Sequence, residues 1–270
     1  MFAGECHMED VARALGVDSI QFRKDHRMPV GYVDGFSKNE NYADSLGQCM
    51  EKGMEYLDYE RKRKEYANQT GPVRRGVGMA LFWYNTAVWP ISLESSSCRM
   101  VLNQDGSIQL QLGETEIGQG ADTAFAQMAA DTVGIPVDMV HTVSTQDTDL
   151  TPFGTGAYAS RQTYVGGFAI KQTGLLLKER ILLYAKELTR QDVNNLDIQE
   201  GYIVRTTDGR KLMSLGELAT EALYSLTHSQ HMTAESTYQI KNNAYSFGCS
   251  FAEVEVCLLY TSPSPRDLST

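Results

Sequence analysis

The sequence predicts a mixed α/β (α+β) fold in two domains, on three observations. Segments whose apolar residues recur with a helical period alternate along the chain with segments rich in β-branched and aromatic residues. The dipeptides Asp105-Gly106 and Asp208-Gly209 each lie between strand-like segments and indicate hairpins. The pair Gly71-Pro72 interrupts the pattern, so we expect residues 1–70 and 71–256 to form separate domains.

The first domain is predicted to be helical. A helix is expected over residues 5–15, where Gly16 ends it, and its apolar face carries Met8, Val11, Ala12 and Leu15. A second helix is expected from about residue 43 to residue 67, with an apolar stripe that begins at Leu46. The charge run at residues 60–65 has Glu at both ends, which is typical of a solvated helix face.

The second domain is predicted to mix strands and helices. Strands are expected at residues 75–85, 98–102, 107–112, 139–144 and 253–256. Helices are expected at residues 121–133 and 162–188, and from Ser214 to about Tyr224. Ser214 and Glu217 have the spacing of a capping box. Residues 145–157 show no periodicity and are expected to form a loop.

Charge and composition exclude several functions. The chain has 270 residues and a formal net charge of −10, which argues against nucleic-acid binding because that requires a basic surface. It has no run of about 18 apolar residues that would span a membrane, and its first residues lack the pattern of a signal peptide. The five cysteines are far apart, so we expect reduced, mostly buried thiols in a cytoplasmic protein rather than a disulfide framework.

The last residues break the pattern of the chain. Residues 257–267 (CLLYTSPSPRD) resemble the in-frame translation of a common sequencing-library adapter. A disordered terminus is the plainer alternative. We expect residues 257–270 to be a non-native, adapter-derived tail and the chain to be a fragment, incomplete at both ends.

A first glycine-rich segment follows an expected strand and opens an expected helix. Gly118 and Gly120 would let backbone N–H groups approach a ligand, and the helix N-terminus would add partial positive charge. Gln119 between them offers an amide that donates and accepts. The segment therefore indicates a site for an anionic, hydrogen-bonding ligand, although a tight structural turn would also explain the glycines.

A second glycine-rich segment precedes the long helix expected at residues 162–188. Its small residues leave space against the backbone, and Ser160 and Arg161 could bond a phosphate or a pterin edge. The alternative is an ordinary helix start with Ser160 as the N-cap. Asp147 and Asp149 upstream could suggest a metal site, but two carboxylates alone are more typical of a braced loop.

Together these segments resemble the xanthine oxidase family of molybdenum hydroxylases, and look most like the molybdenum-binding subunit of bacterial xanthine dehydrogenases. The motifs that carry the resemblance are, in order, 113–123 (GETEIGQGADT), 127–130 (QMAA), 134–136 (GIP), Asp147-Thr148 and 154–163 (GTGAYASRQT). The resemblance implies a molybdopterin-binding domain, with residues 1–70 and 71–256 as parts of its first and second cofactor-binding subdomains.

The resemblance also implies the chemistry and the site. The cofactor would be molybdenum bound to molybdopterin, in bacteria often as the cytosine dinucleotide, and the reaction would hydroxylate a purine such as hypoxanthine or xanthine with oxygen from water. Gln119 would bond the cofactor near molybdenum, in its second shell. The other implied cofactor-binding residues are Gly118, Gly120, Thr123, Gly156, Ala157, Tyr158, Ala159, Ser160 and Arg161.

The resemblance implies further parts of the enzyme that this chain does not supply. Its [2Fe-2S] clusters and FAD would lie on an iron–sulfur subunit and an FAD subunit, in a dimer of heterotrimers. The general-base glutamate is expected beyond the end of this chain, so no catalytic residue is assigned. Glu94 is a candidate for the substrate pocket, against the alternative of an exposed loop glutamate. Hydroxylases of aldehydes, nicotinate or carbon monoxide, and a catalytically inert fragment, are the rival hypotheses.

Overall fold

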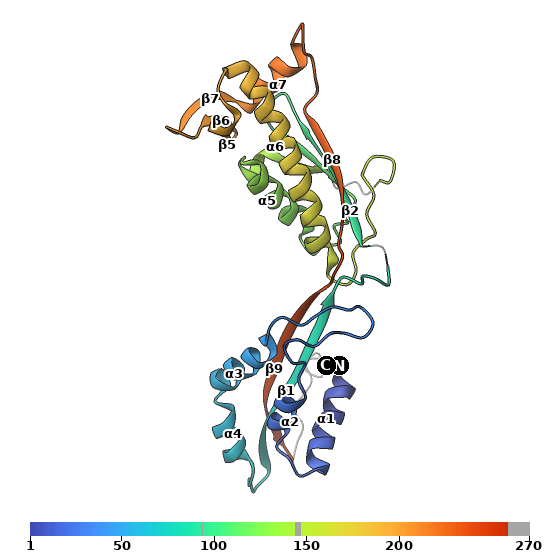
Figure 1. Cartoon of the computed structure of the whole chain (residues 1–270). Coiled ribbons are helices and arrows are strands. Elements are labelled where there is room, and N and C mark those ends of the chain that lie inside the picture. Colours follow the sequence, from blue (N-terminus) through green and yellow to red (C-terminus); the bar gives the residue numbers. More distant parts are fainter. Residues whose placement is uncertain (93, 144–146, 259–270) are drawn as a thin grey trace, which may run out of the picture. The chain divides into compact units, whose positions relative to one another are not determined.

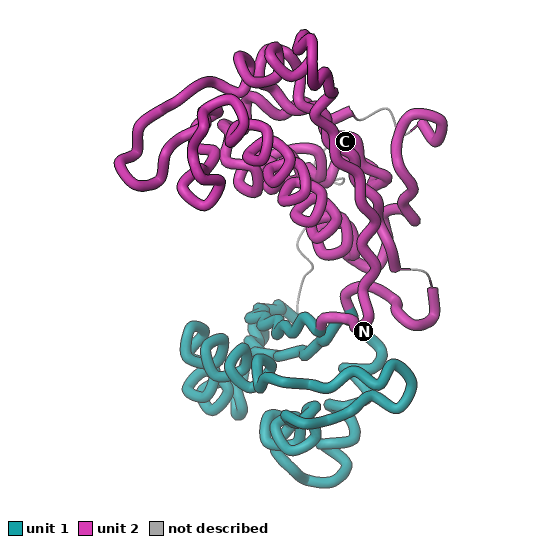
Figure 2. The backbone as a smooth tube through the Cα atoms, turned by 45° about the horizontal axis from the view of Figure 1, so that its top comes forward, with its two compact units in different colours: residues 1–85, 245–270 teal, residues 86–244 magenta. Residues whose placement is uncertain are grey.

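The computed structural model describes residues 1–92, 94–143 and 147–258. The chain forms two compact units, shown in teal and magenta in Figure 2: residues 1–85 with those from 245 onward, and residues 86–244. This division differs from the boundary expected near Gly71. The reason is that β1 (Val73–Thr86) pairs with β9 (Ala244–Cys257), so residues from both ends of the chain build the first unit.

Four helices and the β1–β9 sheet make up unit 1 (Figure 1). The helices are α1 (Phe2–Ala14), α2 (Ser19–His26), α3 (Ser45–Leu57) and α4 (Tyr59–Tyr66). The single helix expected over residues 43–67 was wrong, because Asp58 takes a left-handed conformation (φ 54°, ψ 46°) and separates α3 from α4. The expectation did not include α2, whose start is capped by the Asp18 carboxylate.

A four-stranded sheet forms the centre of unit 2, in the order β4-β3-β2-β8. Its strands are β2 (Ser95–Leu102), β3 (Ile108–Leu112), β4 (Val140–Val143) and β8 (Thr233–Gln239). β2 pairs antiparallel with both β3 and β8, and β3 pairs parallel with β4. A parallel pair needs a crossover connection, which here contains α5 (Ala121–Val133) and a 3₁₀ turn (Val137–Met139).

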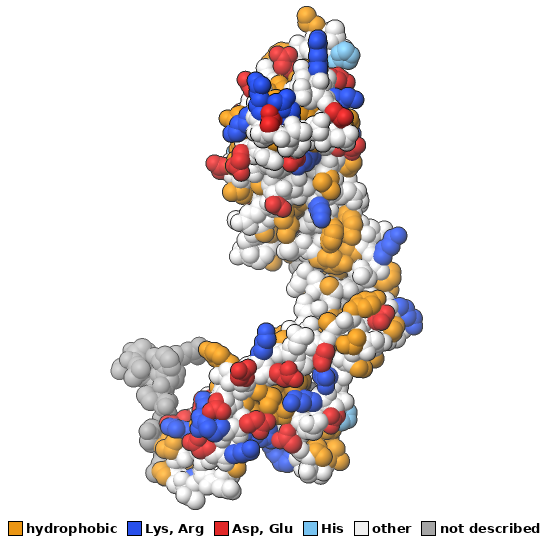
Figure 3. Space-filling model, turned by 60° about the vertical axis from the view of Figure 1, so that its left-hand side comes forward, with side chains coloured by type: hydrophobic (Ala, Val, Ile, Leu, Met, Phe, Trp, Pro, Cys, Tyr) orange, Lys and Arg blue, Asp and Glu red, His pale blue; other side chains and the backbone are white. Residues whose placement is uncertain are grey.

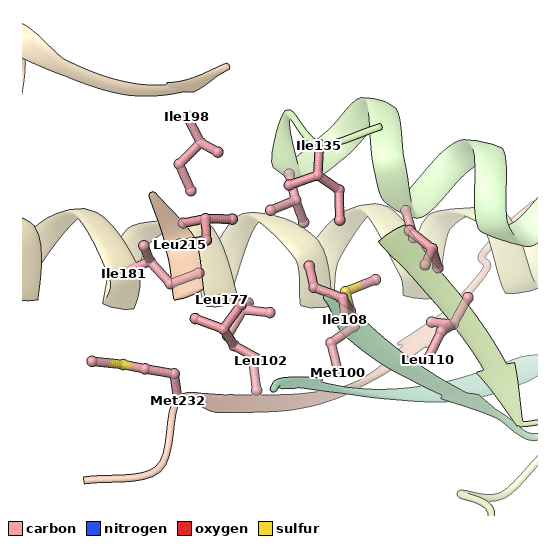
Figure 4. Packing of buried hydrophobic residues seen from close by; sticks show 14 of the residues in the cluster. Met100, Leu102, Ile108, Leu110, Ile135, Leu177, Ile181, Ile198, Leu215 and Met232 are labelled. Atoms are coloured by element: carbon pink, nitrogen blue, oxygen red, sulfur yellow. The ribbon is translucent and has the colours of Figure 1, made fainter. Parts of the chain in front are cut away.

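Two helices pack against the sheet. α6 (Gly167–Thr189) continues a short π-helical segment, η2 (Gln162–Gly166), and α5 has the ends expected from Gly120 and Gly134. Figure 4 shows Leu177 and Ile181 of α6 facing Met100 and Leu102 of the sheet. These four side chains are almost fully buried, so the interior between helix and sheet supplies the main hydrophobic stabilisation of unit 2.

A smaller three-stranded sheet completes unit 2. It consists of β5 (Leu196–Gln199), β6 (Tyr202–Arg205) and β7 (Arg210–Ser214), preceded by a 3₁₀ turn (Val193–Asn195) and followed by α7 (Leu215–Tyr224). The hairpin expected at Asp208-Gly209 and the capping box of Ser214 and Glu217 are both confirmed. β5 and β8 were not expected.

The chemistry of the surface and of the thiols follows the composition. On the face shown in Figure 3, acidic and basic side chains are interspersed in both units. All five cysteines are free thiols, as expected, but the expectation that most are buried was wrong, since Cys98 is buried, Cys6 is exposed and the other three are partly exposed. In the described part of the chain, no helix combines the length and apolar character needed to cross a bilayer.

Candidate functional site

The first glycine-rich segment connects β3 to α5. Gly118 (φ 97°) and Gly120 (φ 86°) both take left-handed conformations, which glycine adopts without the cost that a side chain imposes. A Cβ atom added at either position would meet nothing within 4 Å. The loop is therefore shaped by backbone conformation and leaves open space beside both glycines.

The Glu116 carboxylate binds the N–H groups of this loop. Oε1 accepts from Gly118 N at 2.6 Å and Gly120 N at 3.1 Å, and Oε2 accepts from Asp122 N at 3.1 Å. Hydrogen bonds from the backbone of Asp122, Gly120 and Gly118 lower the pKa of Glu116. The sequence predicted that the N–H groups of these glycines bind an anionic ligand. In the structure they donate to a carboxylate of the same loop.

The Gln119 side chain is exposed and makes three hydrogen bonds within the protein. Its Oε1 accepts from Ile117 N at 2.7 Å, and its Nε2 donates to Thr115 O at 3.0 Å and to Gln162 Oε1 at 2.6 Å. Gln162 is the first residue of η2. The amide of the first segment therefore contacts the residue that directly follows the second segment.

The backbones of the two segments meet at a pair of glycines. A Cβ atom added to Gly154 would lie 2.1 Å from Gly113 O, and one added to Gly113 would lie 2.3 Å from the carbonyl carbon of Phe153. Gly154 also forms a bridge to Ser96 of β2, and Ser97 N donates to Phe153 O at 2.9 Å. Only glycine allows this close approach, so these two residues fix the juxtaposition of the segments.

The end of the second segment exposes a row of backbone donors. Ala159 (φ 47°) and Ser160 (φ 52°) are consecutive left-handed residues, a strained conformation that is concentrated at functional sites. Across the described ranges, no residue accepts a hydrogen bond from the N–H groups of Ala157, Tyr158, Ala159 or Ser160. Ala159 and Ser160 are the central residues of a turn in which Arg161 N donates to Tyr158 O at 3.1 Å, and successive backbone N–H groups of a turn can bind an anion.

The alternative of Ser160 as an ordinary N-cap is wrong. The residue before the helix is Arg161, Ser160 is left-handed, and no side-chain hydrogen bond caps this end. The strained backbone of Ser160 is therefore not explained by helix capping.

Arg161 lies at the centre of a buried ion triad with Glu94 and Glu114. Its Nε donates to Glu94 Oε2 at 2.6 Å, and its Nη1 donates to both carboxylate oxygens of Glu114 at 2.8 and 2.9 Å. Nη1 also donates to Gly156 O at 3.0 Å, and Nη2 to Ser95 O at 2.7 Å. The side chains of all three triad residues are 0% exposed.

The triad changes the interpretation of two predicted site residues. Glu94 is not an exposed loop residue, because it is fully buried and its second oxygen accepts from Val88 N at 2.9 Å. Arg161 directs its guanidinium at protein acceptors, and so joins the second segment to the first through Glu114. Both side chains are buried and contact the backbone of the site through hydrogen bonds.

Burial and pairing shift the pKa values of Glu114 and Arg161. Burial raises the pKa of Glu114 and outweighs the opposing charge of Arg161. For Arg161, burial acts to lower the pKa, but the hydrogen bond to Glu94 and the charge and hydrogen bonds of Glu114 together raise it. The guanidinium therefore stays charged, while Glu114 takes up a proton more readily than an exposed glutamate.

The remaining predicted residues lie around these two segments. Thr123 is exposed in the first turn of α5, and the Tyr158 ring lies 5.5 Å from the Arg161 guanidinium carbon. Asp147 braces its loop, since its Oδ1 accepts from Asp149 N at 2.9 Å. Within the described ranges, no group of three metal-ligating side chains exists.

Sequence reasoning missed Glu114, Glu116 and Gln162. Each lies within a motif that carried the family resemblance. The neighbouring residues in the sequence do not indicate which groups these side chains bond in the folded chain. The acidic residues Glu114 and Glu116 alternate with small or apolar ones beside the glycines. That pattern was the one signal in the sequence that a carboxylate would accept hydrogen bonds from the backbone N–H groups of the loop.

Comparison with known proteins identifies the class of this fold and site. Residues 52–261 match the family model of the molybdopterin cofactor-binding domain, and the chain belongs to this family. It is 42% identical over 257 residues to the xanthine dehydrogenase molybdenum-binding subunit of Escherichia coli O157:H7, covering 95% of this chain and 34% of that protein. The family resemblance and the fold class expected from the sequence are confirmed.

More distant relatives share the fold. The chain is 25% identical over 268 residues to the carbon monoxide dehydrogenase large chain of Hydrogenophaga pseudoflava, covering 92% of this chain and 33% of that protein. The structure of quinoline 2-oxidoreductase from Pseudomonas putida 86 matches with a TM-score of 0.78 at 22% identity, covering 95% of this chain and 34% of that one. The chain thus spans about a third of the length of the relatives it matches.

Proposed function

We propose that this chain binds the molybdenum–molybdopterin cofactor, in its cytosine dinucleotide form, at the two glycine-rich segments. The observation that carries the proposal is the row of open N–H donors at residues 157–160, beside a second loop with open space at Gly118 and Gly120. Open backbone donors suit the phosphate groups of the cofactor, and small residues give them room.

Individual residues have separate roles in this proposal. The N–H groups of Ala157 to Ser160 and the Ser160 hydroxyl bind phosphate or pterin oxygens, and Gly156 gives access because a Cβ atom there would meet nothing within 4 Å. The Gln119 amide bonds the cofactor near molybdenum, and Thr123, which is exposed in the first turn of α5, is a further cofactor-binding residue. Arg161 and Glu94 hold the backbone that carries these groups and contact neither cofactor nor substrate.

The parent enzyme is proposed to be a xanthine-dehydrogenase-like oxidoreductase. When bound, the cofactor supplies two-electron chemistry that adds a water-derived oxygen to an electron-poor carbon of a purine such as hypoxanthine or xanthine. An iron–sulfur subunit and an FAD subunit carry the electrons away, in a dimer of heterotrimers. The 42% identity to a xanthine dehydrogenase subunit, against 25% to a carbon monoxide dehydrogenase chain, favours a purine over the other substrates.

Cofactor content tests the binding proposal. The 270-residue chain is produced in a host that makes the cofactor, and bound molybdenum and pterin are measured after purification. We expect stoichiometric amounts of both. Ala157→Asp places a carboxylate among the open donors and should abolish binding, whereas Ala157→Ser at the same exposed position should retain it. A folded wild-type chain without cofactor would overturn the proposal in favour of an inert fragment.

A further inference from the structure

The orientation of the Gln119 amide is fixed by two backbone groups. Ile117 N can only donate, and it lies 2.7 Å from the oxygen of this amide; Thr115 O can only accept, and it lies 3.0 Å from the nitrogen. A reversed amide would place donor against donor and acceptor against acceptor. Gln119 therefore has one orientation in this loop.

Gln162 completes this arrangement. Its Nε2 donates to the same Thr115 carbonyl at 2.9 Å, which fixes its own amide orientation and turns its Oε1 toward Gln119 Nε2 at 2.6 Å. Both N–H groups of Gln119 are thereby used, one by Thr115 O and one by Gln162 Oε1. One lone pair of Gln119 Oε1 remains for a further donor.

The tether extends into the protein interior. Gln162 is 8% exposed, and it directly follows Arg161, the cation of the buried ion triad. Gln119 itself is exposed. A flexible surface side chain is therefore held by one buried amide, which follows the triad residue Arg161 in the chain.

We propose that Gln162 is a positioning residue that, together with the backbone of Thr115 and Ile117, holds the Gln119 amide in a single orientation toward the bound cofactor. That the amide faces a bound cofactor rests on the proposed function, whereas the hydrogen bond that orients the amide does not. A preset amide avoids the entropic cost of ordering a long side chain when the ligand binds.

The exchange of the Gln119 side-chain amide protons with solvent tests this in the full chain. In ¹⁵N-labelled protein, the Gln119 signals are assigned by their loss in Gln119→Ala and compared with those of Gln172. Gln172 is exposed on α6, and its side chain makes no hydrogen bond to any described residue. We expect exchange at Gln119 to be about tenfold slower, as one net hydrogen bond of about 1.4 kcal/mol would give. Equal exchange at the two residues would overturn the proposal.

The variant Gln162→Leu removes the amide while keeping a similar side-chain volume. We expect it to speed exchange of the Gln119 proton that is donated to Gln162 Oε1, while the proton donated to Thr115 O still exchanges more slowly than those of Gln172. Gln172→Leu should leave both Gln119 rates unchanged. A folded Gln162→Leu protein in which both Gln119 protons exchange as slowly as in the wild type would overturn the proposal. If this variant does not fold, Gln162→Met, which also lacks the amide, replaces it in the same comparison.

Cofactor content separates this inference from the proposed function. A wild-type chain with slow Gln119 exchange but without molybdenum keeps the positioning role and refutes the proposed ligand. A chain that binds molybdenum but exchanges Gln119 protons as fast as those of Gln172 keeps the ligand and refutes the positioning role. In a loaded chain we expect Gln162→Leu to lower the bound molybdenum severalfold.

Discussion

The Nε atom of Arg161 lies 2.6 Å from a carboxylate oxygen of Glu94, and neither side chain has any exposed surface. Glu114 binds the other side of the same guanidinium. Burying charges costs free energy that a well-paired geometry must offset, so removal of one partner leaves the others uncompensated. The stability of unit 2 should therefore depend strongly on this triad.

Arg161→Ala should lower the free energy of unfolding by about 3–5 kcal/mol, because two buried carboxylates lose their cation. Urea unfolding followed by circular dichroism measures this. The matched control is Arg99→Ala, which removes a pair with Glu235 whose side chains are 41% and 50% exposed, and which should cost about 1 kcal/mol or less. Equal losses in the two variants would show that the triad gains nothing from its burial.

Glu114→Gln should change how stability depends on pH. The pKa of Glu114 is raised by burial in the folded state, so the folded chain binds the proton more tightly than the unfolded chain. The wild type therefore loses stability as the pH rises from the ordinary glutamate range through the raised value, and the variant lacks this loss. The wild-type advantage, measured from urea midpoints, should shrink as pH rises. An advantage that grew with pH would show that Arg161 dominates the pKa of Glu114.

The pKa of Glu116 is shifted in the opposite direction to that of Glu114, so its effect on stability should have the opposite dependence on pH. Backbone N–H groups lower its pKa, so its stabilisation of the loop is present above the ordinary glutamate range and is lost as the pH falls through the lowered value. In an NMR titration, the amide signals of Gly118 and Gly120 should move with a midpoint below that of exposed glutamates. Glu116→Gln should abolish the movement. A midpoint in the ordinary range would contradict the carboxylate–backbone contacts.

Gly154→Ala should destabilise the chain by about 1–3 kcal/mol, the usual cost of forcing an extra carbon into a packed interior. The added Cβ would lie 2.1 Å from Gly113 O, so the two segments would have to separate. Gly4→Ala is the control, because this glycine lies within α1 with nothing within 4 Å of its Cβ position, and alanine there should stabilise by about 0.5–1 kcal/mol. Thermal or urea unfolding compares the two, and a neutral Gly154→Ala would refute the close contact.

Local signals in the sequence predicted much of the secondary structure. The ends of α5 follow from Gly120 and Gly134, and the start of α7 from the capping box at Ser214, because each depends on residues that are neighbours in the chain. Asp58 was missed because an aspartate in the left-handed region leaves no compositional mark. β8 was missed because its pairing partner, β2, lies far away in sequence.

The same distinction applies to the candidate site. Glycines mark both loops in the sequence, so their location was predictable. The burial of Arg161 could not be predicted. Its partner Glu94 precedes β2 and its partner Glu114 follows β3, and they meet Arg161 only in the folded chain. A charged residue beside a ligand loop looks the same in sequence whether it faces solvent or the interior.

The contact between Gly113 and Gly154 has a consequence for the order in which the protein becomes functional. These glycines are far apart in the sequence and meet in the folded structure, where β3 pairs with β4, so an unfolded chain does not hold the two loops together. A ligand that recognises both loops binds the native state alone and shifts the folding equilibrium toward it by mass action. Loading and folding of unit 2 are in this sense one coupled equilibrium, and ligand supply sets how much native protein accumulates.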